Sequence, residues 1–313
     1  MGLDGAEVPL SPTTLQGRPL WRRLHLPDRY SLFGMAIILP ALVFFLVFRV
    51  IPLAYALWVS FHEWNLIRPM QWVGLQNYWR AFSDEAFLES LWHSFLYAAV
   101  VVAFALSLAL LVAVLLDQKL RFAAVYRGIF FMPVVMSWVV ISIVWRVMYA
   151  PTFGLVSNVL GWFGLPDVPI LTNGALALFG IMIMGTWHAL GFYMVVFLAG
   201  LQTIPVHLYE AALIDGAGKL QTFTKITLPL LRPTMLFAMV MCTIDTLQVF
   251  VQVYLMTRGG PADSTMVAVY YIYRTAFYLQ EMGYGAALGM ILLLLVLGVT
   301  LLYLRFVKVE AYY

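Results

Sequence analysis

The sequence predicts an all-α membrane protein with six transmembrane helices, and both its composition and the lengths of its apolar runs lead to that prediction. Hydrophobic residues make up 63% of the 313 residues and charged residues 11%, and the mean hydropathy is +0.91. A soluble domain carries about 25% charged residues. A water-soluble fold of this length could not bury so much apolar surface in one core, so the unit to count is the membrane span.

Six stretches are long and apolar enough to cross a bilayer, which takes about 20 helical residues. They are residues 32–61, 95–116, 129–148, 175–201, 235–256 and 285–307. The first is overlong and contains Arg49 and Pro52, and its apolar run lacks the cleavage site of a signal peptide, so it is predicted to be a retained span. The transmembrane domain is thus predicted over residues 32–307, between an N-terminal tail, 1–31, and a C-terminal tail, 308–313.

Six spans place both termini on one side of the membrane, and the distribution of cations predicts that this side is the cytoplasm. The segments assigned to that side hold Arg18, Arg22, Arg23, Arg29, Lys119, Arg121, Arg127, Lys219, Lys225, Arg232, Arg305 and Lys308. The opposite loops hold only Arg68, Arg80, Arg258 and Arg274. The connection before the fifth span therefore faces the cytoplasm.

Charge and cysteine content exclude several classes of function. The net charge of +3 comes without a basic stripe or run, so no nucleic-acid partner is predicted. The single cysteine, Cys242, excludes an intrachain disulfide and a cysteine-based zinc site.

The cytoplasmic loop at residues 204–233 contains Gly216-Ala217-Gly218-Lys219, which suggests a phosphate-binding loop at first sight. The G-x-x-x-x-G-K-[ST] pattern needs glycine where Leu213 stands and a hydroxyl where Leu220 stands, so nucleotide binding here is rejected.

The polar pattern of this loop instead predicts a helix, a turn and a second helix. The first helix ends at Asp215-Gly216, with Asp215 expected to cap the second helix, and Pro229 is expected to end or kink that second helix. Small residues beside Glu210 would let another protein approach closely. An ordinary connector with a favourable turn is the alternative that this physical reasoning leaves open.

The residues of this loop resemble the E-A-A-x-x-D-G-A … F-x-x-I-x-L-P signature of permease subunits of bacterial ABC importers, in the branch that carries sugars and glycerol phosphate. The matching residues are Glu210, Ala211, Ala212, Asp215, Gly216, Ala217, Phe223, Ile226, Leu228, Pro229 and Pro233. Three further stretches resemble family motifs: V-G-L-Q-N-Y at residues 73–78, T-R-G-G-P at 257–261 and G-Y-G-A-A at 283–287. The resemblance covers roughly residues 32–306.

This resemblance implies a type I importer permease fold in a bacterial or archaeal inner membrane. It implies four kinds of partner: a second, homologous permease, two cytoplasmic ATPases, an extracytoplasmic substrate-binding protein and a sugar-type substrate. The ATPases are expected to bind ATP and magnesium, so the chain itself is predicted to hold no cofactor and to be no enzyme. The residues expected to couple to the ATPases are Glu210, Ala211, Ala212, Asp215, Gly216, Ala217 and Gly218.

Polar side chains inside spans are costly and usually face a pathway or a partner. Asp245, Gln248 and Gln252 are spaced to share one face of the fifth span, and sugar hydroxyls need such groups together with aromatic rings. The predicted substrate pathway comprises Asp245, Gln248, Phe250, Gln252, Tyr254, Trp187 and Tyr193. Hydrogen bonding between helices is the alternative. The scarcity of cations inside the spans favours a neutral sugar over a phosphorylated one.

Two other functions, a secondary transporter or channel and an intramembrane hydrolase, fit the sequence less well. A stand-alone secondary transporter or channel would need intramembrane coupling charges, of which only Asp245 is prominent, and repeated halves, of which none is evident. An intramembrane hydrolase would need a nucleophile with a base, or paired acids, and the sequence shows no such set.

Overall fold

The computed structural model describes residues 29–118 and 121–306 and divides into two units, residues 1–55 and 56–313, which are considered separately. Most of the predicted tails, 1–31 and 308–313, lies outside the described residues. Among the described residues, five helices are long and apolar enough to span a membrane, and a sixth span is formed if a sharply bent pair of helices counts as one.

The first unit is helical throughout its described part. Helix α1, Arg29–Phe45, passes through a π-helical turn, η2, Leu46–Val50, into α2, Ile51–Ser60. Pro52 lacks an N–H group and would clash with the carbonyl four residues earlier in a regular helix. The wider π turn lies just before this proline, and the helix continues instead of breaking.

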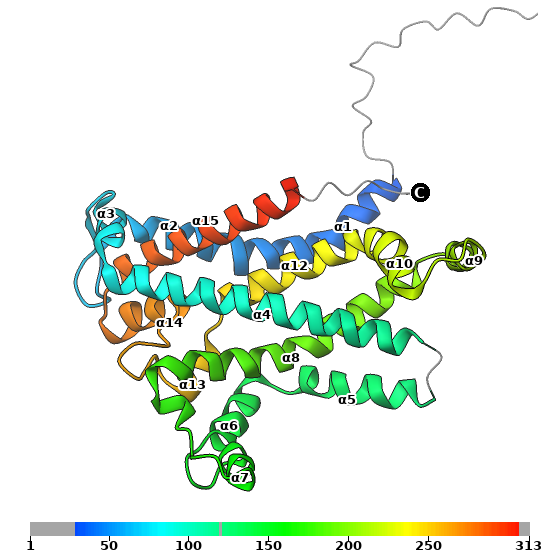
Figure 1. The fold of residues 1–313 in the computed structure, drawn as a ribbon. Helices are drawn as coiled ribbons and strands as arrows, with labels where there is room; N and C mark the ends of the chain where they lie inside the picture. Colours follow the sequence, from blue (N-terminus) through cyan, green and yellow to red (C-terminus); the bar gives the residue numbers. More distant parts are fainter. Residues whose placement is uncertain (1–28, 119–120, 307–313) are drawn as a thin grey trace, which may run out of the picture. The chain divides into compact units, whose positions relative to one another are not determined.

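The second unit is built around α4, Glu85–Asp117, and α8, Gly174–Gln202, which pack along each other. Helix α12, Arg232–Leu247, packs on α4, while α5, Ala123–Val135, packs on α8 (Figure 1). Small residues line the contact surface of α4, where Ala105, Ala109 and Ala113 are fully buried. Small side chains let helices approach closely in lipid, where van der Waals packing drives their association.

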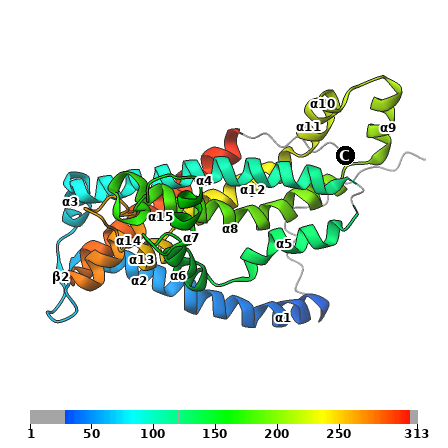
Figure 2. The same cartoon turned by 60° about the horizontal axis from the view of Figure 1, so that its bottom comes forward.

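The two ends of this unit carry different elements. One end holds α9, Val206–Ile214, α10, Lys219–Thr222, the π turn η4, Phe223–Thr227, and α11, Leu228–Leu230. The other end holds α3, Gln76–Ser83, α14, Ala268–Tyr273, and the π turn η5, Arg274–Tyr278, next to the start of α15, Met282–Phe306 (Figure 2).

The third predicted span, 129–148, is not one straight helix. Helix α5 ends at Val135, α6 begins at Trp138 and continues to Met148, and the two are bent by 98°. The Ser137 hydroxyl caps α6 by accepting a hydrogen bond from the Val139 amide at 3.3 Å. Pro133 lies within the last turn of α5. Helix α6 then leads to α7, Leu155–Trp162, and a short 3₁₀ turn, η3, Ile170–Thr172, precedes α8.

The V-G-L-Q-N-Y stretch, residues 73–78, directly follows a small hairpin and packs against it through Asn77. Strand β1, His62–Glu63, pairs antiparallel with β2, Gln71–Trp72. The buried Asn77 amide donates to the carbonyls of Ser60 and His62, at 2.9 and 3.0 Å. Gly283 packs against the same hairpin so closely that an added Cβ would collide with the His62 carbonyl. These contacts explain why asparagine and glycine occupy the two motifs.

Asp84 joins three elements at this end. One carboxylate oxygen caps α4 by accepting from the Phe87 amide at 3.2 Å, and the other accepts from the hydroxyls of Tyr271 and Tyr284 at 2.8 and 2.6 Å. Burial alone would raise the pKa of this carboxyl, but the bonds from Tyr284, Tyr271 and Phe87 and the charge of Arg80 hold its pKa below the usual value. Ionised Asp84 therefore ties α4 to α14 and α15.

Candidate functional site

The loop that carries the E-A-A stretch folds as a compact helical pair at one end of the molecule. Helix α9 ends in a Schellman motif, in which the Gly216 amide donates to the Leu213 carbonyl at 3.2 Å and the Ala217 amide to the Ala212 carbonyl at 2.9 Å. Gly216 has φ +72°, a left-handed conformation that glycine adopts at little cost. The glycine therefore sets the angle between α9 and α10.

One part of this turn differs from the expectation. Asp215 does not cap the second helix: Gly218 holds the N-cap position of α10, without a side-chain bond, and Asp215 is the C-cap of α9. The Schellman turn uses Gly216 and Ala217 to leave α9, so Asp215 stays on the helix that it terminates.

Pro229, which was expected to end or kink the second helix, lies within its last turn. The π turn η4 lies just before α11, which contains Pro229, and helical structure persists to Leu230. As at Pro52, the wider turn lies where a regular helix would bring the proline ring against a carbonyl. The Tyr209 and Thr227 hydroxyls lie 3.2 Å apart and link the two arms of the loop.

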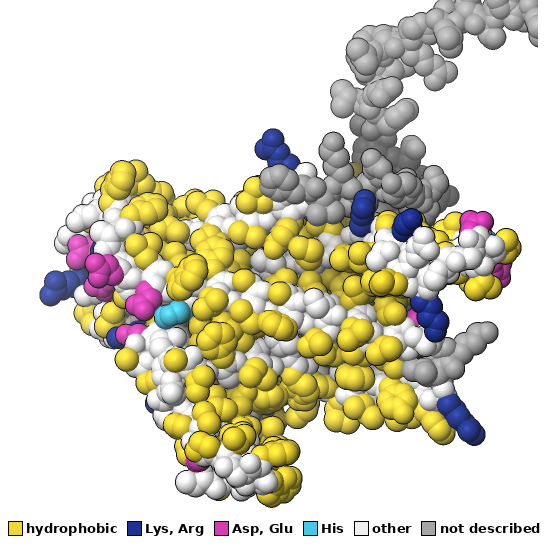
Figure 3. Space-filling view, viewed as in Figure 1, with side chains coloured by type: hydrophobic (Ala, Val, Ile, Leu, Met, Phe, Trp, Pro, Cys, Tyr) yellow, Lys and Arg dark blue, Asp and Glu magenta, His cyan; other side chains and the backbone are white. Residues whose placement is uncertain are grey.

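The outer face of this loop is apolar and unusually exposed. The exposed fractions are 78% for Leu213, 85% for Ile214 and 77% for Leu220, and the Glu210 side chain is exposed beside them. Ala212, by contrast, is buried. Cationic side chains of the loop and of α5 lie at this end, whereas acidic side chains gather around α3 and the start of α4 (Figure 3). Such an apolar patch with a charged edge is typical of a protein-binding surface.

A second candidate site is a cavity of about 440 Å³ between α4, α5, α6, α8 and the break between α12 and α13, Val251–Met256. Small-molecule sites commonly enclose about 300–1,000 Å³. Its lining residues are Tyr97, Val101, Val134, Trp138, Gly185, His188, Ala189, Phe192, Tyr193, Cys242, Asp245, Thr246, Gln248, Val249, Phe250, Val251 and Gln252.

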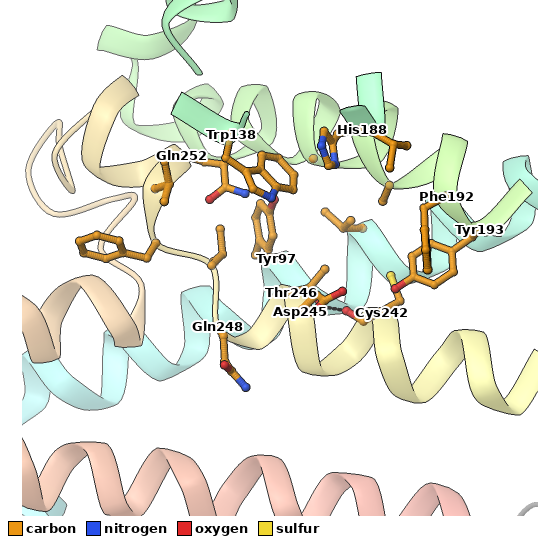
Figure 4. A pocket seen from close by; sticks show the side chains of 17 residues that line it. Tyr97, Trp138, His188, Phe192, Tyr193, Cys242, Asp245, Thr246, Gln248 and Gln252 are labelled. Atoms are coloured by element: carbon orange, nitrogen blue, oxygen red, sulfur yellow. Dashed lines mark hydrogen bonds between the residues drawn. The ribbon is translucent and has the colours of Figure 1, made fainter. Parts of the chain in front are cut away.

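The cavity lies where the fifth span loses its helical hydrogen bonding. Helix α12 ends at Leu247, and the backbone angles of Gln248 and Phe250 are non-helical before α13 resumes. Asp245, Gln248 and Gln252 therefore do not share one helical face, which corrects the expectation from their spacing. All three line the cavity, but Gln248 extends away from the aromatic rings whereas Gln252 lies beside them (Figure 4).

Trp138 and His188 form the aromatic wall of the cavity. Their ring centroids are 3.7 Å apart and the planes are inclined by 32°. His188, on α8, thus contacts α6 through a tilted ring pair. On the other side the Tyr193 ring extends toward Cys242 and Asp245 (Figure 4). The buried Thr246 hydroxyl donates to the Cys242 carbonyl at 2.6 Å.

The structure separates two of the predicted pathway residues from the cavity. Trp187 does not line it and packs on Trp145, with 41% of its surface exposed. Tyr254 also lies outside the lining and stacks on Phe250, with ring centroids 5.5 Å apart. Trp138 and Tyr97 line the cavity although neither was predicted to do so from the sequence. Pro133 and Ser137, a proline and a good N-cap residue just before Trp138, were the signals that could have placed Trp138 at a break.

The chain was compared with known families and proteins. Residues 105–308 match the family described as "Binding-protein-dependent transport system inner membrane component". The probable ABC transporter permease protein YesP of Bacillus subtilis is 36% identical over 278 residues, covering 87% of this chain and 89% of that protein. The trehalose/maltose transport system permease protein MalF of Thermococcus litoralis is 35% identical, covering 88% and 94%.

Relatives named for other solutes also match. The sn-glycerol-3-phosphate transport system permease protein UgpA of Pectobacterium atrosepticum is 29% identical, covering 95% of this chain and 98% of that protein. Among solved structures, a chain of the bacterial alginate ABC transporter in complex with its pentasaccharide-bound periplasmic protein aligns with a TM-score of 0.79 at 24% identity, covering 91% and 95%. This likeness extends the match of fold to nearly the whole chain.

Proposed function

The chain belongs to the binding-protein-dependent inner membrane components of ABC importers, and we propose that it forms one half of an ATP-driven pathway for a sugar or a similarly polar small solute. It is a multi-pass inner membrane permease and not an enzyme. Family membership carries this proposal, and the exposed loop and the cavity supply its mechanism. The other subunits are a second, homologous permease, two ATPases and an extracytoplasmic binding protein.

The loop at residues 204–233, which includes α9, α10 and α11, is the surface for the ATPase. Exposure of the apolar side chains of Leu213 and Ile214 to water is unfavourable, and a groove on a partner protein would bury them. Glu210, Ala211, Ala212, Asp215, Gly216, Ala217 and Gly218 form or support this surface. ATP is bound and hydrolysed on the partner, so the loop needs no phosphate site of its own.

Movement of the loop has a direct route to the cavity. Tyr209 and Thr227 link its two arms, and α11 leads into α12 with a single residue between them. Helix α12 ends at Leu247, where the non-helical segment begins that lines the cavity. Closure of the ATPase pair would therefore shift α12 and reshape the cavity, which is a hinge-type conformational step. The binding protein delivers solute at the end of the permease that carries α3 and α14. This end faces outward, and both termini lie in the cytoplasm.

The cavity supplies the contacts that a sugar needs. Asp245 and Gln252 offer hydrogen-bonding groups, while Trp138 and Phe250 offer rings against which the C–H face of a sugar can lie. Tyr193 lines the part of the cavity next to Asp245. Gln248 lines the cavity but extends away from its rings, and Tyr254 lies outside the lining; both are assigned to surfaces that the second permease completes. Trp187, which packs on Trp145, is left out of the proposed pathway.

Purification of the tagged chain from its native membrane in mild detergent tests the assembly. Mass spectrometry should find a second six-span permease and an ATPase with the wild-type chain. With Glu210→Lys, the ATPase should be lost while the second permease remains, because the reversed charge lies in the coupling surface and not between the spans. A wild-type chain that purifies alone, or a Glu210→Lys chain that retains the ATPase in full, would contradict the proposal.

A further inference from the structure

We propose that this cavity selects uncharged, hydroxyl-rich solutes and rejects anionic ones, an inference that rests on the proposed function of the cavity as the substrate pathway. Family membership does not decide this question, because relatives are named both for trehalose and maltose and for sn-glycerol-3-phosphate.

The charges around the cavity favour a neutral solute. Of the described residues that line it, Asp245 is the one carboxylic acid, and neither lysine nor arginine is among them. An imidazole is largely uncharged above about pH 7, so His188 supplies no permanent cation. A phosphate, sulfonate or uronate group would lose its hydration here and find no counter-ion on this wall, which is a costly state for a buried charge.

The arginine on α6, one of the helices around the cavity, is engaged elsewhere. Arg146, on α6, donates to the Leu255 carbonyl at 3.4 Å and does not line the cavity. That bond joins α6 to α13, as expected of an arginine within a span that pairs with backbone. The guanidinium therefore stabilises the frame of the cavity and leaves the lining without a cation.

The polar side chains of the cavity lining can form hydrogen bonds with the hydroxyls of a solute. The Asp245 carboxyl lies on the exposed side of α12 and can accept from two hydroxyls, and the Gln252 amide can both donate and accept. The Trp138 ring, packed against His188, supplies an aromatic surface in the same lining. A ring with hydroxyls on its edge and C–H groups on its face fits this arrangement, whereas a fixed negative charge does not.

The test uses the complete importer in lipid nanodiscs at pH 7.5, without the binding protein, so that the cavity alone selects. Saturation-transfer NMR would measure binding of matched pairs: trehalose and trehalose 6-phosphate, maltose and maltose 6′-phosphate. We expect the neutral member of at least one pair to bind about tenfold more tightly or better than its phosphate. Trp138→Ala should abolish its signal, whereas Trp187→Ala, outside the lining, should leave it unchanged.

Variants that change the charge of the cavity lining give a second test of the same proposal. Gln252→Lys and Asp245→Lys each place a cation in the lining and should shift the preference toward the phosphate by about tenfold. Asp245→Asn should leave the phosphate the weaker ligand, because it adds no cation. The wild-type ratio is decisive even where a lysine variant fails to insert.

The outcomes separate the two proposals. If a sugar phosphate binds the wild-type importer as tightly as its neutral partner, and Trp138→Ala abolishes both signals, the cavity is the substrate site and charge selection is wrong. If neither member of either pair gives a signal that depends on Trp138, the role of the cavity in the pathway is overturned, and the inference falls with it.

Discussion

Gly216 controls the coupling loop through its backbone and not through side-chain contacts. Its φ of +72° is required by the Schellman turn that ends α9, and nothing lies within 4 Å of the position that a Cβ would take. Gly218 also has open space for a Cβ, but its φ is −72°. Comparing variants of the two glycines therefore distinguishes the effect of backbone conformation from the effect of space for a side chain.

Gly216→Ala should weaken coupling more than Gly218→Ala does. An alanine at position 216 would adopt a left-handed conformation at a cost of about 1–2 kcal/mol, and the turn between α9 and α10 would shift. We expect Gly216→Ala to lower ATP-driven uptake at least several-fold, with normal insertion in the membrane. Equal uptake by the two variants would show that the turn angle does not matter for coupling.

Trp138 is the aromatic residue in the cavity lining that we expect to contribute most to solute binding. Trp138→Ala removes the face that stacks on His188, and we expect the KM for uptake to rise about tenfold, equivalent to about 1.4 kcal/mol of binding. ATPase co-purification should not change, because Trp138 is remote from the α9 loop. Trp187→Ala is the matched control, and an equal rise in KM for both variants would contradict the assignment of the cavity.

At the scale of elements, α4 depends on ionised Asp84 at its N-terminus. The pKa of this carboxyl is lower in the folded protein than its ordinary value of about 3.9. The resulting stabilisation is therefore fully present above pH 3.9 and is lost as the pH falls through the lowered folded pKa.

Asp84→Asn should reduce thermal stability at neutral pH, because asparagine accepts the two tyrosine hydroxyls more weakly than a carboxylate does. Melting of the detergent-solubilised protein from pH 7 down to pH 3 should show the gap between wild type and Asp84→Asn narrowing at the acid end. Glu89→Gln, an exposed acid on the same helix, is the control and should follow the wild type. A gap that stays constant down to pH 3 would contradict the account of Asp84.

The sequence predicted the spans better than their interruptions. Apolar length is enough to place α4, α8, α12 and α15, because lipid requires a continuous helix of about 20 residues. The break at Gln248–Phe250 contains neither glycine nor proline, so composition gave no signal there. The bend before Trp138 was signalled only by Pro133 and Ser137. Tertiary contacts decided both breaks, and these breaks build the cavity.

The coupling loop was predictable for the opposite reason. Its turn is encoded locally, by Gly216 and the small residues around it, and its helical arms lie where the sequence placed them. The error there, at Asp215, concerns which end of a helix the residue caps, and this depends on hydrogen bonds that a residue pattern does not specify.

At the scale of the whole molecule, the proposed function assigns energy input and solute binding to separate regions. The exposed loop lies at one end, the hairpin and the Asp84 network lie at the other, and α12 runs from the loop to the cavity. Under this proposal the partner ATPases supply the nucleotide sites, and the permease transmits movement along α12.

The most direct test is solute uptake by proteoliposomes that contain the complete importer, with ATP inside and the loaded binding protein outside. The account predicts uptake that needs both ATP and the binding protein. This uptake should be lost with Glu210→Lys, while the permease itself still inserts in the membrane. Uptake by this chain alone, without ATP or a binding protein, would contradict the account and support a secondary transporter instead.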